Sequence, residues 1–139
     1  MKTLLLATLL LTSVAQAEVH TIMAQGASFE PTVIKIAPGD QLAFVNMAGH
    51  TVSTLDEYSP KDTEFHTASS WQSSMSVDFV TAPINVEGIY LVKCDPHWGM
   101  GMGLGIIVGN PTNLDDITAL NPKGADKRLM NKVEKLLIQ

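Results

Sequence analysis

The sequence predicts an all-β domain, a sandwich or a barrel, followed by a short helical tail. Two observations support this prediction. Between residues 18 and 110, short segments of β-branched or alternating apolar residues are separated by turn residues. After residue 110 the apolar residues recur at helical spacing instead. Many short strands with regular turns are typical of sandwiches and barrels, and the length suits one hydrophobic core.

The first 17 residues have the layout of a secretory signal peptide. Lys2 precedes an apolar stretch from residue 4 to residue 11, and the segment ends in small residues at Ala15-Gln16-Ala17. This stretch is well short of the roughly 20 residues of a membrane-spanning helix. We therefore expect cleavage after Ala17 and a periplasmic protein without a membrane span. A single mature domain, residues 18–139, would then comprise a sandwich to residue 110 and a helical tail from residue 111.

Strands are expected wherever apolar residues alternate or β-branched residues cluster. The turn Pro38-Gly39-Asp40 separates the second expected strand from the third. A polar stretch from residue 56 to residue 72 predicts a long connection between sheets. The expected strands are residues 19–24, 31–37, 41–47, 75–80, 89–94 and 104–108.

The tail predicts two helices. Asn113 is a candidate N-cap for a short helix with Leu114, Ile117 and Leu120 on one side. Pro122 then interrupts the chain. The last stretch is expected to form an amphipathic helix whose apolar face packs on the sandwich, with apolar residues Leu129, Met130, Val133, Leu136 and Leu137.

The net charge is negative, and the charged residues are unevenly distributed along the chain. Residues 18–110 contain three lysines against ten carboxylates, whereas the tail is nearly balanced. An acidic surface argues against nucleic acid, whose binding depends on neutralised phosphates. The acidic balance is explained mainly by solubility.

One loop indicates the chemistry. Cys94, His97 and Met102 lie within nine residues directly after an apolar strand, and Cys94 is the only cysteine. A thiolate, an imidazole and a thioether form a soft ligand set that suits copper. An exported chain with one cysteine cannot form an internal disulfide. Metal ligation explains the thiol and its setting better than an inert buried cysteine does.

A trigonal copper site with a weak axial methionine needs a second histidine. His50 is the best candidate because it follows a strand and a glycine turn, whereas His20 and His66 rank lower. Met100 competes with Met102 for the axial position. The predicted cofactor is one copper ion that alternates between Cu(I) and Cu(II), in an electron carrier and not an enzyme.

The motifs in order closely resemble the pseudoazurin branch of the cupredoxins, the small type 1 blue copper proteins. The resemblance covers essentially the whole chain after residue 17 and includes the two-helix tail. Its motifs are Phe29-Glu30-Pro31, Pro38-Gly39-Asp40, Gly49-His50, the run from Gly88 to Cys94, Pro96-His97, Met100-Gly101-Met102 and Val108-Gly109.

The resemblance implies a Greek-key β-sandwich of about eight strands with two C-terminal α-helices. It also implies His50, Cys94, His97 and Met102 as the copper ligands, and electron passage through the His97 ring edge. The implied partners of the monomer are periplasmic redox proteins: a copper nitrite reductase, other denitrification enzymes or a c-type cytochrome. An exposed apolar patch around His97 would consist of Met47, Ala48, Pro96, Trp98, Gly99 and Met100.

The sequence departs from the family pattern at two places. Thr51 follows the first histidine, where the family usually has Asn, although the Thr51 N–H can still donate to the Cys94 sulfur. The lysine ring expected around the patch is reduced to Lys93 and Lys61. These departures predict a shifted reduction potential and an altered choice of partner.

Two other functions fit the ligands less well. A copper chaperone would expose its methionines or cysteines, whereas these ligands belong to a closed loop at a strand end. An enzyme with a cysteine nucleophile would not need three soft ligands on one loop.

Overall fold

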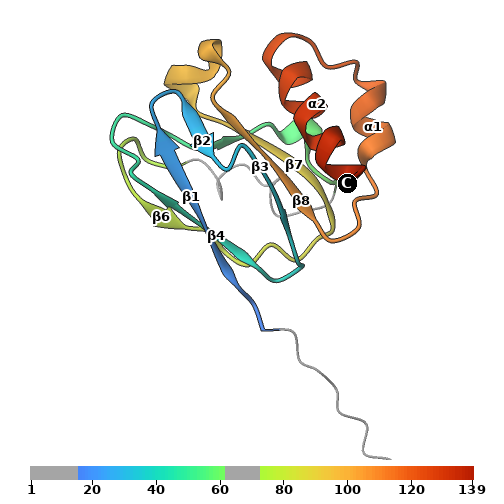
Figure 1. Cartoon of the computed structure of the whole chain (residues 1–139), viewed down its shortest axis with the longest axis horizontal. Coiled ribbons are helices and arrows are strands. Elements are labelled where there is room, and N and C mark those ends of the chain that lie inside the picture. Colours follow the sequence, from blue (N-terminus) through green and yellow to red (C-terminus); the bar gives the residue numbers. More distant parts are fainter. Residues whose placement is uncertain (1–15, 62–72) are drawn as a thin grey trace, which may run out of the picture.

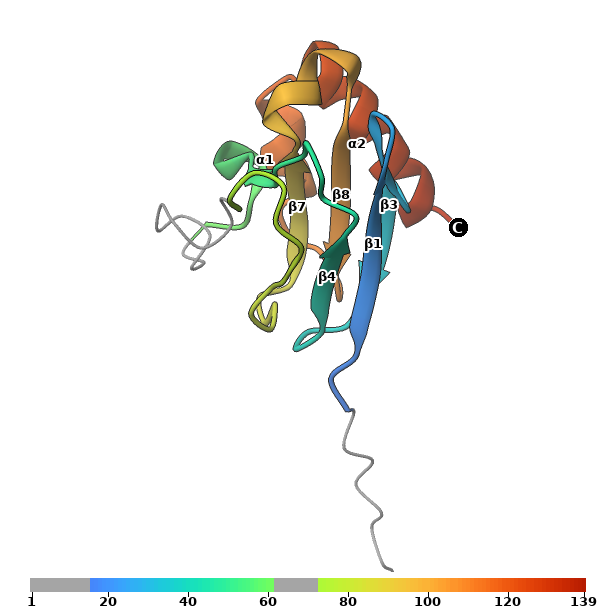
Figure 2. The ribbon, with the colours of Figure 1, turned by 90° about the vertical axis from the view of Figure 1, so that its left-hand side faces the viewer.

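The chain forms two sheets of four strands, and the strands of each sheet come from distant parts of the sequence. The computed structural model describes residues 16–61 and 73–139. One sheet has the strand order β2-β1-β4-β6, and the other has the order β3-β8-β7-β5. Figures 1 and 2 show the two sheets as the layers of a sandwich, with the helices beside the second sheet. The first sheet contains β1 Val19–Gln25, β2 Ser28–Glu30, β4 Gln41–Val45 and β6 Phe79–Val80. The second contains β3 Val33–Ile36, β5 Ser53–Thr54, β7 Gly88–Lys93 and β8 Gly103–Val108.

Both sheets mix parallel and antiparallel neighbours. β1 pairs with β4 in parallel and β3 pairs with β8 in parallel, whereas the remaining pairs are antiparallel. From β2 to β7 each connection crosses from one sheet to the other, whereas β1 and β2, and likewise β7 and β8, are paired within one sheet. The predicted all-β sandwich of about eight strands with two C-terminal helices is confirmed.

The main core lies between the sheets, where alternate residues of the strands point inward. Ile22 and Phe44 come from one sheet, and Val92 and Ile106 come from the other; all four are fully buried. Cys94 and Met102 belong to the same buried cluster. Burial of large apolar side chains stabilises the fold by about 1.5–3 kcal/mol each. Because Cys94 and Met102 are part of this core, the core holds the loop between them in place.

The two tail helices cover the outer face of the second sheet. α1 spans Leu114–Ala119 and α2 spans Gly124–Leu137. Val133 of α2 is fully buried, and a Cβ added to Gly105 of β8 would lie 2.3 Å from the Val133 Cγ2 atom. The close approach requires glycine at this position. The predicted packing of the last helix on the sandwich is confirmed.

Asn113 stands at the N-cap position of α1, but its side chain makes no capping hydrogen bond. Its Oδ1 atom accepts from the Ile89 N–H at 2.8 Å, and its Nδ2 atom donates to the Ile89 carbonyl at 2.9 Å. The predicted position of Asn113 at the start of the helix is therefore right, but the prediction that its side chain caps the helix was wrong. The amide instead pairs with β7 as an additional strand would, which holds the start of the tail against the sheet.

The predicted strands agree with the structure except in one region. Residues 75–80 were expected to form a strand, but only Phe79 and Val80 do. Met75 and Val77 are 59% and 49% exposed, and Ser76 between them has a φ of 64°. This positive φ turns the chain, so the apolar alternation there does not mark a buried face. Two short strands, β2 and β5, were not predicted.

The described residues contain no helix that is long and apolar enough to cross a membrane. The expected signal segment, residues 1–17, lies almost entirely outside the described residues. The polar connection is described only as far as residue 61, where it contains the short 3₁₀ helix η1 Asp56–Tyr58.

Candidate metal centre

The loop after β7 closes on itself through backbone hydrogen bonds. Cys94 immediately precedes the 3₁₀ helix η3, Asp95–Met100, and Gly101 ends that helix in the left-handed conformation, with a φ of 87°. The Cys94 N–H donates to the Met102 carbonyl at 3.0 Å, and the Met102 N–H donates to the His97 carbonyl at 3.2 Å. These bonds fix the backbones of all three residues relative to one another.

His50 reaches the same end of the sandwich from the loop after β4. Gly49 has a φ of 79°, a conformation that glycine adopts without strain. The His50 N–H donates to the Met47 carbonyl at 2.9 Å, which closes the turn. Two side chains from the neighbouring loop hold it in place: Asp78 accepts from the Met47 N–H, and the Ser76 hydroxyl accepts from the Gly49 N–H, both at 2.9 Å.

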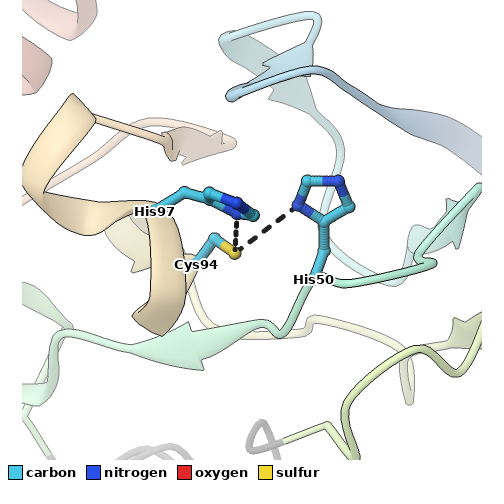
Figure 3. Close-up of side chains that lie close together, drawn as sticks. All are labelled: His50, Cys94 and His97. Atoms are coloured by element: carbon cyan, nitrogen blue, oxygen red, sulfur yellow. Dashed lines mark hydrogen bonds between the residues drawn. The ribbon is translucent and has the colours of Figure 1, made fainter.

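Figure 3 shows the rings of His50 and His97 turned toward the Cys94 sulfur. The sulfur lies 3.7 Å from His50 Nδ1 and 3.4 Å from His97 Nδ1. The potential ligand atoms of the three residues all lie within 4.8 Å of one another. Bonds of about 2.0–2.3 Å from nitrogen and sulfur to one metal separate the ligand atoms by roughly 3–4 Å. The spacing therefore fits donor atoms that share a single ion.

Burial keeps this group of donors away from water. Cys94 is fully buried and His50 is 7% exposed, whereas His97 is partly exposed. Burial, and then the neighbouring His97 ring, lowers the pKa of His50. The lowered pKa favours the neutral imidazole, which is the form that binds a metal.

Met102 and Met100 differ sharply in their surroundings. Met102 is fully buried in the core cluster that contains Cys94, whereas Met100 is 65% exposed. Of these two methionines, Met102 is thus the one that lies in the buried cluster with the thiol.

A polar network lies next to the sulfur. The Thr51 N–H donates to the Cys94 sulfur at 3.5 Å, as expected from the sequence. The carboxylate of Asp95 accepts hydrogen bonds from the hydroxyls of Ser53 and Thr51, and it forms an ion pair of 3.0 Å with Lys93. The hydrogen bond from Ser53, assisted by Lys93 and Thr51, outweighs burial and holds the pKa of Asp95 below its ordinary value.

The other two histidines lie elsewhere or outside the description. His20 Nε2 on β1 lies 2.8 Å from Asp40 Oδ2, at the end of the sandwich opposite to η3. In Figure 2 the turn before β4 and the start of β1 lie at the lower end, while η3 lies at the upper end. His66 falls outside the described residues.

The surface around His97 is apolar but smaller than predicted. Ala48, Pro96, Gly99 and Met100 are exposed. Met47 is fully buried in the core, so its assignment to this surface was wrong. Its backbone is held by Asp78, and its side chain turns inward beneath the loop.

Trp98 also contributes less to that surface than expected. It is partly buried against the second core cluster, with Leu129 of α2. A Cβ added to Gly103 would lie 2.8 Å from Trp98 Cζ3 and 3.0 Å from Leu129 Cδ2. The tail helix thus packs against the loop that carries Cys94 and His97.

Residues 16–109 match the model of the copper binding proteins of the plastocyanin/azurin family. The chain belongs to this family. It is a blue copper electron carrier with a copper cofactor, and not an enzyme.

Individual members of the family are similar over most of the chain. The pseudoazurin of Paracoccus pantotrophus is 37% identical over 119 residues, which cover 81% of this chain and 77% of that protein. The crystal structure of native pseudoazurin from Hyphomicrobium denitrificans has a TM-score of 0.68 at 30% identity, covering 84% of this chain and 97% of that one. A pseudoazurin structure from Methylobacterium extorquens, at 23% identity and a TM-score of 0.64, supports the fold.

Several side chains that shape the centre were not identified from the sequence. Ser76 and Asp78 brace the His50 loop from a segment that was expected to be a strand. Ser53 and Asp95 are brought together by the pairing of β5 with β7, in which Ser53 stands opposite Lys93. No local pattern indicates these roles, because each depends on contacts between distant segments.

Proposed function

We propose that His50, Cys94, His97 and Met102 bind one copper ion as a type 1 site in a periplasmic single-electron shuttle. The observation that supports it best is the convergence of a buried thiol and two imidazoles from two loops. Copper supplies a one-electron redox couple at this position. The Cys94 thiolate and the two imidazoles would hold the ion strongly, and the buried Met102 thioether would add a weak soft donor.

The rigidity of both loops supports electron transfer. Cu(I) and Cu(II) favour different geometries, so a site that cannot relax keeps rearrangement small in both states. The Cys94 loop is closed by the bonds between Cys94, His97 and Met102, and the His50 loop is held by Ser76 and Asp78. A copper chaperone must deliver its ion to another protein. The burial of Cys94 instead favours retention of the ion.

The partly exposed His97 ring is the proposed route for electrons. Among the four proposed ligands it is the one that is not buried, and Pro96, Gly99 and Met100 of the same 3₁₀ helix are exposed. A small apolar contact surface suits brief encounters between redox proteins.

The proposed partners are other periplasmic redox proteins: a copper nitrite reductase, further denitrification enzymes or a c-type cytochrome. Lys93 is paired with Asp95, so it contributes little free positive charge to the surface. Stopped-flow mixing with each candidate at several salt concentrations would identify a partner. An effective partner should be reduced or oxidised within milliseconds, and a rate that falls with salt would indicate attraction between opposite charges.

Export would follow from the proposed signal peptide, residues 1–17, and would leave a single domain of residues 18–139. Expression of the full chain in a bacterium, followed by fractionation and N-terminal sequencing, tests both points. We expect a periplasmic protein that begins at Glu18. A full-length protein in the cytoplasm would contradict the proposed location.

The ligand assignment is tested by matched histidine variants. His50→Ala should lose the blue colour and type 1 copper, whereas His66→Ala should keep both because it leaves the proposed sphere intact. Met102→Leu should keep copper and raise the reduction potential, since a weak axial donor that favours Cu(II) is removed. Met100→Leu is its control and should leave the potential unchanged. The assignment fails if His50→Ala remains blue, or if Met100→Leu and not Met102→Leu shifts the potential.

A further inference from the structure

The first residues of the processed chain carry a set of nitrogen donors that the proposed copper centre does not use. If cleavage follows Ala17, the chain begins Glu18-Val19-His20, with a free amine on its first residue and an imidazole on its third. The amine, the amide nitrogens of Val19 and His20, and Nδ1 of His20 can surround one ion in a plane, joined by five- and six-membered chelate rings. A square plane of nitrogens suits Cu(II) or Ni(II).

The structure brings the two outer members of this donor set to one side chain. The Glu18 nitrogen lies 2.9 Å from Asp40 Oδ1, and His20 Nε2 lies 2.8 Å from Asp40 Oδ2. The contact with Asp40 uses Nε2, whereas Nδ1 is the ring nitrogen that closes a six-membered chelate ring with the His20 amide. Among the described residues the His20 ring makes no other hydrogen bond. Nδ1 is therefore available to a metal.

The beginning of β1 can leave the sheet without disturbing the core. Glu18 and Val19 are exposed and His20 is partly exposed, whereas Ile22 is the first fully buried residue of the strand. Figures 1 and 2 show this end of β1 at the lower edge of the sandwich. Successive amide nitrogens point in alternate directions along a strand, but a planar chelate needs them on one side. Metal binding must therefore break the first two residue pairs between β1 and β4.

We propose that the processed N-terminus, Glu18-Val19-His20, is a second metal site that binds Cu(II) or Ni(II) through nitrogen donors alone. The inference rests on the proposed cleavage after Ala17 and not on the copper centre. Binding expels one proton from the ammonium group and one from each of the two amides, and the neutral imidazole completes the plane. Deprotonated amides favour the divalent ion, whereas soft sulfur ligands also hold Cu(I). The second site therefore holds a divalent ion and takes no part in the electron shuttle.

Asp40 competes with the metal for this segment. Its carboxylate binds the amine and the His20 ring, and both contacts must break before the chelate forms. Asp40 is 5% exposed, so water replaces these contacts poorly. Asp40→Asn removes the negative charge that attracts the ammonium group. Because a charge-assisted hydrogen bond is thereby weakened, this variant should bind Ni(II) about tenfold more tightly than the unmodified chain.

The test titrates copper-loaded chains of defined first residue with Ni(II) near neutral pH. The chain that begins at Glu18 should bind one Ni(II) as a yellow, diamagnetic, square-planar complex and should keep its blue colour. A chain that begins at Ala17 is the matched control, because it is longer by one residue and moves His20 to the fourth position. This control should not form the complex, and neither should His20→Gln in the chain that begins at Glu18. N-terminal sequencing of the exported protein identifies the natural first residue.

The inference is supported if only the chain that begins at Glu18 forms the square-planar complex and Asp40→Asn tightens it. It is overturned if the chain that begins at Ala17 forms the same complex, because the amine of Glu18 is then not a ligand. Absence of the complex in the chain that begins at Glu18, or export of a protein with another first residue, would also overturn it. Unchanged affinity in Asp40→Asn would overturn the role of Asp40. A colourless protein that forms the Ni(II) complex would instead refute the proposed copper centre and leave the N-terminal site standing.

Discussion

Asp40 and Asp95 lie at opposite ends of the sandwich, and each gathers several donors around one carboxylate. Asp40 accepts from the Glu18 and Ala37 N–H groups, both at 2.9 Å, and lies 2.8 Å from a ring nitrogen of His20. Asp95 accepts from Ser53 and Thr51 and pairs with Lys93. The Asp40 side chain is 7% exposed, whereas that of Asp95 is 41% exposed.

Because of this difference in exposure, we expect Asp40 to stabilise the fold and Asp95 to affect the reduction potential of the copper site. Hydrogen bonds to a buried charge are worth more than those at the surface, because water cannot replace them. Asp40 joins the start of β1 to the turn before β4, far from the metal centre. Asp95 contributes less to stability, but it stands next to the sulfur. Similar bonding patterns at the two ends should therefore have different measurable consequences.

The largest effect is expected at the buried end. Asp40→Ala removes a buried acceptor that binds donors on three residues, which should cost about 2–4 kcal/mol of unfolding free energy. Denaturant unfolding of the apoprotein measures this loss. The visible spectrum and reduction potential of the copper-loaded variant should be unchanged, and a clear shift in either would break the proposed separation of the two ends.

The pH dependence of stability should also come from the buried end. Burial alone would raise the pKa of Asp40, but bonds from Glu18, His20 and Ala37 outweigh it and hold that pKa below its ordinary value. The unfolded chain then binds more protons in acid, so this stabilisation is complete above about pH 4–5 and is lost as pH falls through the folded pKa. Unfolding of the apoprotein from pH 6 to pH 3 should show the loss. Asp40→Asn should be less stable at pH 6 and should approach the unmodified protein in acid. Equal slopes in the two proteins would contradict this assignment.

Removal of the proposed signal peptide should strengthen the contact between residue 18 and Asp40. If cleavage follows Ala17, as proposed, the Glu18 nitrogen that lies 2.9 Å from Asp40 Oδ1 becomes a charged ammonium group. A charge-assisted bond is stronger than a neutral one, so the chain beginning at Glu18 should gain about 1 kcal/mol over a chain beginning at Ala15. Thermal or urea unfolding at pH 6 compares the two forms. The gain should disappear in Asp40→Asn; a gain that persists there would show that Asp40 is not the acceptor.

The smallest stability effect is expected at the exposed end. Asp95→Ala removes an ion pair and hydroxyl contacts of a half-exposed side chain, so it should lose no more than about 1 kcal/mol. The potential should nevertheless shift, unlike that of Asp40→Ala. A loss as large as that of Asp40→Ala would show that both carboxylates stabilise the fold in the same way.

The sequence was sufficient for the local features of the centre. Cys94, His97 and Met102 could be predicted because one short loop contains all three, and His50 because a strand and a glycine turn precede it. The expected ligand roles remain a proposal, although the structure places His50, Cys94 and His97 side by side.

Features that depend on contacts between distant segments could not be predicted. Asn113 was expected to cap a helix, but its amide binds Ile89 instead. Met47 was expected at the surface, but the Asp78 contact fixes its loop so that the side chain enters the core. The alternation of Met75 and Val77 indicated a strand, although the chain turns between them. In each case a tertiary contact decided between conformations that the local sequence allowed.

The central claim is that the Cys94 thiolate and two imidazoles share a single copper ion. The most direct test is titration of the purified apoprotein with Cu(II), followed by visible and electron paramagnetic resonance spectra, with Cys94→Ser in parallel. We predict an intense blue band that saturates at one copper per chain, a type 1 resonance, and neither signal in Cys94→Ser. A protein that binds copper without colour, or an intensely blue Cys94→Ser variant, would contradict this account.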